Sequence, residues 1–193
     1  MGRSRSYNED AVLSGAMHAF RRKGYQGVSV RDLEDATGLK MGSIYNSFGD
    51  KAGLFDAAFT HYNRVVLQRR IERHAPPESG LRGLCDLFLS LFHEPGGTSF
   101  GCLITNSAVE FGGGDNSHHC ISEGLRVLLN TFANRLAIAR RDGVLRAGVD
   151  PAGASVKLLA LYQGVLVLIR AGHDKAALKR MIIDEFNDLE GPS

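Results

Sequence analysis

Apolar side chains recur every three to four residues along almost all of this chain, and this spacing limits the possible folds more than any other feature. The spacing matches the 3.6-residue period of the α-helix. The stretch nearest to the alternation of a β-strand, Val28-Ser-Val-Arg31, is too short to count as one. With 193 residues, of which 44% are hydrophobic and 23% charged, the chain is long enough to bury a core. We therefore expect an all-α protein.

Residues that start and stop helices divide the chain into segments. Gly24 and Gly38 are placed to end helices, Ser29 forms a variant of the capping box with Asp32, and Asp50 is an N-cap. The expected helices span about 8–23, 29–37, 41–47, 51–74, 79–93, 101–112, 117–141, 150–172 and 174–190. We predict a three-helix DNA-binding domain with an N-terminal arm over residues 1–51. A larger helical domain over 52–193 is reached through the linking helix 52–74.

The segment from Ser29 to Ser47 is typical of a helix-turn-helix, two short helices joined by a turn at Gly38. Glycine adopts a positive φ there, and Leu39 is expected to be buried between the helices. The second helix of this motif lies in the major groove of DNA. Its outward residues are small or hydrogen-bonding, suited to phosphates and base edges: Lys40, Gly42, Ser43, Tyr45 and Asn46. Two short helices of a bundle with polar outer faces remain the alternative.

The stretch VSVRDLEDATGLKMGSIYNSFGDKAGLF, with its Tyr45, Phe48, Lys51 and Leu54 spacing, resembles the DNA-binding domain of the TetR family of transcriptional regulators. The resemblance covers about residues 8–62. Carried over by position, it implies that the DNA contacts come from Ser29, Arg31, Lys40, Met41, Ser43, Tyr45, Asn46 and Lys51. Ser29 stands where many relatives have Thr, so the hydroxyl is kept. Met41 stands where Ser or Pro is common, which bears on operator preference.

Charge adds little to this interpretation. The net charge of the chain is +2, and residues 1–51, with eight basic and six acidic side chains, carry all of it. A polyanionic partner is only weakly indicated. A helical interaction module that does not contact DNA therefore stays open as an alternative function.

The resemblance also implies a C-terminal domain that binds an inducer and forms a homodimer. The helix near 150–172 is apolar on nearly every side, and the helix near 174–190 carries a stripe of Leu178, Met181, Ile182, Phe186 and Leu189. We expect these two helices to form a four-helix interface with the partner copy. Core helices of a monomer are the alternative. A dimer places two recognition helices about 34 Å apart, as a near-palindromic operator requires.

The segment FGCLITNSAVEF, residues 100–111, resembles a segment of TetR regulators of which some respond to electrophiles through a cysteine. Cys102 is the candidate sensor thiol, because a helix N-terminus favours the thiolate. Thr105, Asn106 and Glu110 are candidates for the surrounding ligand site. A small buried core residue is the alternative for Cys102, and a disulfide with Cys85 or Cys120 stays open. We expect the effector signal to travel through the fourth helix.

No metal or cofactor is expected. The run His118-His119-Cys120 has metal-ligating side chains, but neighbours on a helix point about 100° apart and no further ligands are spaced to join them. The Gly-Thr-Ser-Phe-Gly stretch at 97–101 matches a hydrolase nucleophile elbow, which needs a parallel sheet that we do not expect here. Ser99 is more plausible as a helix cap. The acidic pair Glu34-Asp35 is expected on a solvated face.

The termini and the apolar runs favour a cytoplasmic protein. MGRSRS lacks the apolar region of a signal peptide; it matches a myristoylation pattern, although a basic arm with Arg3 and Arg5 is the simpler interpretation. The longest apolar run, 158–169, is shorter than the roughly 20 residues that cross a bilayer. We therefore predict a cytoplasmic, non-enzymatic repressor that binds double-stranded operator DNA as a homodimer and is released by an unknown small-molecule inducer or by thiol modification.

Overall fold

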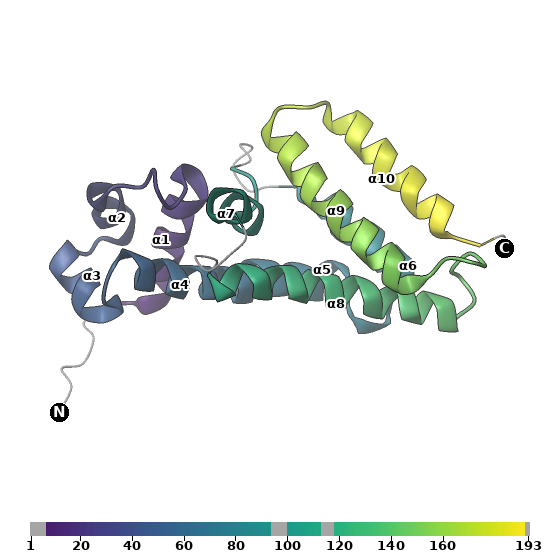
Figure 1. Ribbon diagram of the computed structural model, residues 1–193, viewed down its shortest axis with the longest axis horizontal. Coiled ribbons are helices and arrows are strands. Elements are labelled where there is room, and N and C mark those ends of the chain that lie inside the picture. The colour runs from purple at the N-terminus through teal and green to yellow at the C-terminus, as the bar shows by residue number, and fades with distance from the viewer. Residues whose placement is uncertain (1–6, 94–99, 113–117, 192–193) are drawn as a thin grey trace. The chain divides into compact units, whose positions relative to one another are not determined.

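The computed structural model describes residues 7–93, 100–112 and 118–191, which form helices joined by turns (Figure 1). The α-helices are α1 (Glu9–Lys23), α2 (Val30–Thr37), α3 (Met41–Phe48), α4 (Lys51–Tyr62), α5 (Arg69–His74), α6 (Gly80–Leu89), α7 (Leu103–Phe111), α8 (His119–Arg141), α9 (Pro151–Arg170) and α10 (Lys175–Leu189). A π-helical segment, Asn63–Gln68, makes residues 51–74 continuously helical, and 3-10 turns cover Pro77–Ser79 and Ser90–Phe92. β-Pairing in the described segments is limited to an isolated bridge between Leu145 and Glu190. The expected all-α class is confirmed.

Packing divides the chain into two compact units. The first holds Met1–Val66 with Cys102–Ser122, and the second holds Leu67–Gly101 with Glu123–Ser193. By packing, α4 and α7 therefore belong with α1, α2 and α3. The division at residue 51, made for the DNA-binding function, stays a prediction. The arm with Arg3 and Arg5 and the proposed cap Ser99 lie outside the described residues.

The core of the first unit is aromatic where α1 meets α4. Phe20 and Phe55 are fully buried and meet edge to face at 5.1 Å between ring centroids, and Tyr25 lies 5.2 Å from Phe55. Burying side chains of this size stabilises the fold by about 1.5 to 3 kcal/mol each. At Gly15 of α1 a Cβ would lie 2.0 Å from the carbonyl oxygen of Ala36. The close crossing of α1 and α2 therefore requires glycine at this position.

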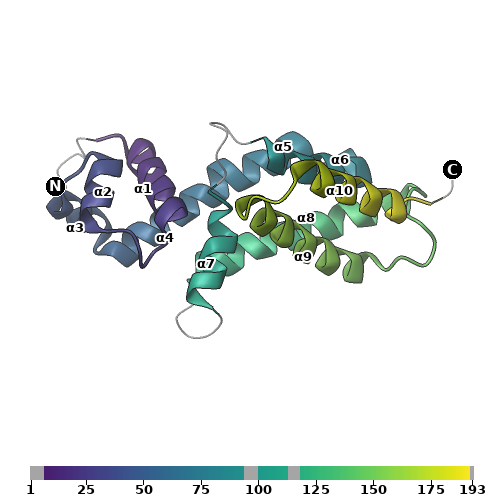
Figure 2. The same ribbon diagram turned by 90° about the horizontal axis from the view of Figure 1, so that it is seen from above.

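The second unit is a bundle of α6, α8, α9 and α10, which lie side by side in both views (Figures 1 and 2). Phe88 of α6 is at its centre. The ring of Phe88 lies 5.6 Å from Phe132 of α8, 5.1 Å from Tyr162 of α9 and 5.3 Å from Phe186 of α10. Each contact joins a different helix to α6, so this one side chain packs against the three other helices of the bundle.

Helix α9 buries one side and exposes apolar residues on the other. Leu158, Tyr162 and Ile169 are buried, whereas Val156 and Val167 are 58% and 49% exposed. By length and composition alone α9 is long and apolar enough to cross a membrane, a test that core helices of soluble proteins also pass. Of the predicted stripe on α10, Met181 is exposed, and four residues are buried within the chain: Leu178, Ile182, Phe186 and Leu189.

Candidate nucleic-acid interface

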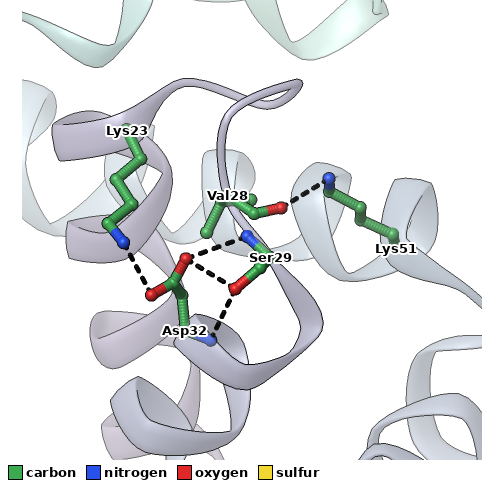
Figure 3. A network of polar contacts seen from close by, with 5 residues as sticks. All are labelled: Lys23, Val28, Ser29, Asp32 and Lys51. Atoms are coloured by element: carbon green, nitrogen blue, oxygen red, sulfur yellow. Dashed lines mark hydrogen bonds and ion pairs between the residues drawn. The ribbon is translucent and has the colours of Figure 1, made fainter.

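Helix α2 begins at the capping box that the sequence predicts (Figure 3). The hydroxyl oxygen of Ser29 accepts a hydrogen bond from the N–H of Asp32 at 3.2 Å, and the Asp32 carboxylate accepts one from the N–H of Ser29 at 2.9 Å. Lys23 of α1 lies 2.6 Å from the same carboxylate. The hydrogen bond from Lys23, followed by those from Ser29, holds the pKa of Asp32 well below its usual range. The start of α2 is thus fixed to the end of α1.

The turn between α2 and α3 has the predicted glycine geometry. Gly38 has φ of 69° and donates its N–H to the carbonyl oxygen of Glu34 at 2.9 Å. A residue with a side chain resists this left-handed conformation. Leu39 is half-buried beside the turn, where full burial was expected.

Glu34, which sequence reasoning assigned to a solvated face, contacts the start of α3. Its carboxylate accepts a hydrogen bond from the N–H of Met41 at 2.8 Å, and the ammonium of Lys40 lies 3.4 Å away. The bond from Met41, and then the positive charge of Lys40, lowers the pKa of Glu34. An acidic side chain of α2 therefore caps α3, because the side chain of Lys40, the N-cap residue of α3, makes no hydrogen bond to the backbone of the first turn.

Helix α3 presents its polar residues outward. Ile44 is fully buried and holds the inner face, and Phe48 is half-buried. Tyr45 is 43% exposed. The other predicted contacts on or before this helix are also exposed, except the half-buried Met41: Lys40, Gly42, Ser43 and Asn46. Ser29 and Arg31, at the start of α2, are exposed as well. These residues are thus accessible to a DNA duplex, as a recognition helix requires.

Lys51 makes an internal contact. Its ammonium donates a hydrogen bond to the carbonyl oxygen of Val28 at 2.8 Å (Figure 3). The ammonium also lies 4.9 Å from the centre of the Tyr25 ring. Both contacts join the first turn of α4 to the loop before α2. Contact between Lys51 and a DNA phosphate stays a prediction.

Helix α7 holds the loop that follows α1. The Glu110 carboxylate accepts hydrogen bonds from the backbone N–H groups of Tyr25 at 2.8 Å and Gln26 at 2.6 Å. Asn106 donates to the carbonyl oxygen of Arg21 at 3.1 Å. Gly24 has φ of 79°, a left-handed conformation that favours glycine, and a Cβ there would also lie 2.9 Å from the Glu110 carboxylate. Two of the three side chains predicted around a ligand, Asn106 and Glu110, thus contact the end of α1 and the loop after it.

Comparison with known proteins decides the family. The sequence profile described as "Bacterial regulatory proteins, tetR family" matches residues 12–58, and the profile "Tetracyclin repressor-like, C-terminal domain" matches residues 77–183. This chain belongs to the TetR family. The first match confirms the resemblance stated for the helix-turn-helix, and the second confirms the TetR-type C-terminal domain.

Individual TetR proteins resemble the whole chain. The HTH-type transcriptional repressor ComR of Escherichia coli is 27% identical over 191 residues, 94% of this chain and 87% of ComR. A cysteine mutant of the TetR regulator CifR, solved with 26-bp double-strand operator DNA, is 25% identical with a TM-score of 0.78, covering 96% of this chain and 98% of CifR. Reduced E. coli NemR has a TM-score of 0.81 at 17% identity, over 95% of this chain and 97% of NemR, and shows the shared fold. The predicted TetR-type transcriptional regulator with an operator-DNA partner is confirmed.

Cys102, the candidate sensor thiol, is buried at the start of α7. It is the N-cap residue of α7, is 6% exposed, and its sulfur lies 3.2 Å from the hydroxyl of Tyr62 at the end of α4. Thr105, one turn further on, is buried. All three cysteines lie in the described segments and are free thiols, so the disulfide left open by the sequence is absent from this structure. The sensing role of Cys102 and the ligand roles of Thr105, Asn106 and Glu110 stay predictions.

Cys120 lies in a second polar cluster of this unit. Asp56 of α4 lies 2.6 Å from Nδ1 of His118 and accepts a hydrogen bond from the Cys120 thiol at 3.5 Å. Burial, and then the charge of Asp56, raises the pKa of Cys120 to about 12. The sequence indicated no further ligand beside His118 and Cys120. The structure corrects this by bringing Asp56 to them from 62 residues away.

Proposed function

We propose that this TetR protein is a transcriptional repressor that binds a near-palindromic operator as a homodimer and releases it when a small molecule or thiol reagent acts at the N-terminus of α7. The observation that carries the DNA-binding part is α3, which buries Ile44 and exposes Ser43, Tyr45 and Asn46. The similarity to ComR, a repressor, supports repression over activation. The similarity to CifR, solved on operator DNA, supports operator DNA as the partner.

Dimerisation is assigned to the outer faces of α9 and α10. Val156 and Val167 are eleven residues apart, about three helical turns, and so share one face of α9. Ala160 and Gly164 lie between them on that face and are small, which favours close approach of a partner helix. Met181 and Ile183 add exposed apolar area on α10. A second copy covers these residues and sets two α3 helices on one side of the operator.

Release is assigned to Cys102 because it stands at one end of α7 while Glu110 stands at the other. The sulfur contacts Tyr62, and Glu110 holds the loop between α1 and α2. When N-ethylmaleimide adds to the thiol, a carbon–sulfur bond forms and the thiol proton passes to the ring carbon. Because the sulfur is buried among packed side chains, an adduct on it displaces its neighbours, α7 shifts and the Glu110 contacts change. The loop that positions α2 then moves, and affinity for DNA falls.

Gel shifts with the DNA upstream of the gene test the DNA-binding part. Tyr45→Ala and Asn46→Ala are expected to weaken binding by about 1 to 3 kcal/mol each, the range for specific base contacts. Size-exclusion chromatography should show that both variants remain dimers. Val109→Ala, a change at an exposed residue of α7, is the matched control. Unchanged binding in both recognition-helix variants contradicts the assignment of α3.

Treatment with N-ethylmaleimide tests the release. Wild-type protein and Cys85→Ala are expected to leave the operator after alkylation, whereas Cys102→Ala stays bound. Equal release from all three removes Cys102 as the sensor and leaves a non-covalent inducer.

A dimer without affinity for DNA at low salt favours the alternative function, a helical interaction module that does not contact DNA. Membership in a family of regulatory proteins supports a non-enzymatic function, and we place the protein in the cytoplasm, where its operator is.

A further inference from the structure

The cluster of Asp56, His118 and Cys120 is not used by DNA binding or by the Cys102 response. Its three ligand atoms, a carboxylate oxygen, an imidazole nitrogen and a thiol sulfur, all lie within 4.8 Å of one another. They come from α4 and from the start of α8, in the same compact unit. Oxygen, nitrogen and sulfur donors held together in this way are the ligand set of a borderline-soft divalent metal.

Two of the three separations between ligand atoms lie within about 1 Å of those around a tetrahedral ion. Zinc bonds of about 2.0 to 2.3 Å at tetrahedral angles put ligand atoms about 3.3 to 3.8 Å apart. The Cys120 sulfur already lies 3.5 Å from the Asp56 oxygen. The oxygen lies 2.6 Å from Nδ1 of His118, so a metal replaces that hydrogen bond and widens the gap by less than about 1 Å. A rotation of the Asp56 side chain is enough for this change.

The surroundings hold two of the three ligands in place. The His118 ring packs against Phe55 at 4.8 Å and Phe111 at 4.6 Å between ring centroids. The carbonyl oxygen of Cys120 accepts a hydrogen bond from the side-chain amide of Asn63 at 3.0 Å. Packing and hydrogen bonds of this kind orient metal ligands before the ion arrives.

The third ligand is open to solvent. The Asp56 side chain is 53% exposed and the His118 side chain 16% exposed, so an ion can enter from the Asp56 side. That side also leaves room for a water molecule as the fourth ligand. A site buried on all sides would lack such an entry path.

We propose that Asp56, His118 and Cys120 form a binding site for a divalent transition metal, with Zn²⁺ as the reference ion and water as the fourth ligand. Cys120 binds as the thiolate and its proton passes to solvent. The bound ion joins α4, which directly follows the recognition helix α3, to the start of α8. The site goes beyond the proposed repressor function and is independent of Cys102.

Cobalt substitution tests the site in the untagged full-length protein, reduced and freed of metal with a chelator. Co²⁺ is expected to bind once per chain and to give tetrahedral visible bands with a thiolate-to-cobalt charge-transfer band, and Zn²⁺ is expected to displace it. In Cys120→Ser the charge-transfer band disappears. Asp56→Asn and His118→Ala weaken binding by more than about tenfold, the lower end of losses seen for residues that only support a ligand.

His119→Ala and Cys85→Ser are the matched controls. His119 is exposed and adjacent to both ligands in sequence, and Cys85 lies in the other unit; both variants should bind cobalt as the wild type does. Circular dichroism and gel shifts check that each variant folds, and Asp56→Asn changes an exposed side chain that the fold tolerates. Absence of the charge-transfer band in the wild type, its survival in Cys120→Ser, or unchanged affinity in folded Asp56→Asn overturns the proposal.

Discussion

The carboxylate of Glu34, in α2, accepts a hydrogen bond from the backbone N–H of Met41, the first residue of α3, at 2.8 Å. The first N–H groups of a helix have no partner within the helix, and Lys40 at the N-cap position provides none. Glu34 therefore fixes the direction in which α3 leaves the turn. In the proposed DNA complex, the angle at which Tyr45 and Asn46 approach the duplex therefore depends on this bond.

Glu34→Ala is expected to weaken operator binding without removing any residue that faces DNA. The loss of the α3 cap leaves the start of the recognition helix frayed, and we expect roughly a tenfold loss of affinity or less. Asp35→Ala is the matched control, since Asp35 is the exposed neighbouring acid. Gel-shift titrations measure both. Equal affinities for the two variants contradict the role of Glu34 as a cap.

Asp32 makes stability depend on pH in the acid range. The bond from Lys23, and then those from Ser29, lowers the pKa of Asp32 in the folded chain. The folded state thus binds this proton less tightly than the unfolded state, and the stabilising effect is complete above the ordinary aspartate pKa of about 3.9. It is lost as the pH falls through the lowered value. Urea denaturation at several pH values should show the wild type more stable than Asp32→Asn at neutral pH, with the difference shrinking below about pH 4. A pH-independent difference contradicts the linkage.

Lys51→Met separates a structural role from a phosphate contact. The variant loses the hydrogen bond to the Val28 carbonyl oxygen, so we expect a lower melting temperature and a free energy of unfolding reduced by about 1 kcal/mol. The salt dependence of DNA binding gives the second readout. If the ammonium also neutralises a phosphate, the slope of log affinity against log salt falls by about 0.9. An unchanged melting temperature shows that the contact with Val28 contributes nothing.

Val167→Glu is expected to separate the dimer. A carboxylate on the outer face of α9 has to be desolvated when the partner copy covers it, and its symmetry mate repels it. Val144→Glu, at an exposed valine in the turn before α9, serves as the control. Light scattering after size exclusion should show monomers for the first variant only. Operator affinity should fall by roughly 10²-fold with the loss of the second half-site. A stable dimer of Val167→Glu removes this face from the interface.

The sequence predicts the parts of the interface that depend on neighbouring residues. Ser29 and Asp32 are three residues apart, and Gly38 and Asp50 cap the helix ends at which they lie. Local sequence patterns are therefore enough to identify them. The contacts that join segments are different. Glu110 lies 84 and 85 residues from the amides it binds, and Asp56 lies 62 residues from His118. A single sequence carries no signal for such pairs, because they depend on how helices pack.

Which residues of a helix are exposed is also only partly predictable from the sequence. Val30 has the spacing of an inward residue with Leu33, yet it is exposed while Leu33 is fully buried. The exposure of Val30 depends on how α2 packs against its neighbours, which a helical period alone does not reveal. The π-helical segment Asn63–Gln68 also lacks a local cause, since its residues fit an ordinary helix.

Gly42→Ala is expected to raise stability and lower DNA affinity together. Gly42 lies in α3, and a Cβ there would meet no other atom within 4 Å. Alanine in a helix is favoured over glycine by about 0.5 to 1 kcal/mol, so the free energy of unfolding should rise by that amount. The added methyl group, however, occupies the surface where the backbone of α3 approaches the groove.

The expected gain in stability and loss of DNA affinity have opposite signs, which makes this substitution informative. A residue that serves only the fold changes stability and affinity in the same direction, because a less stable protein binds less. Urea denaturation measures the first quantity, and gel shifts at fixed salt measure the second. Tighter or equal DNA binding by Gly42→Ala shows that this part of α3 does not approach the duplex closely.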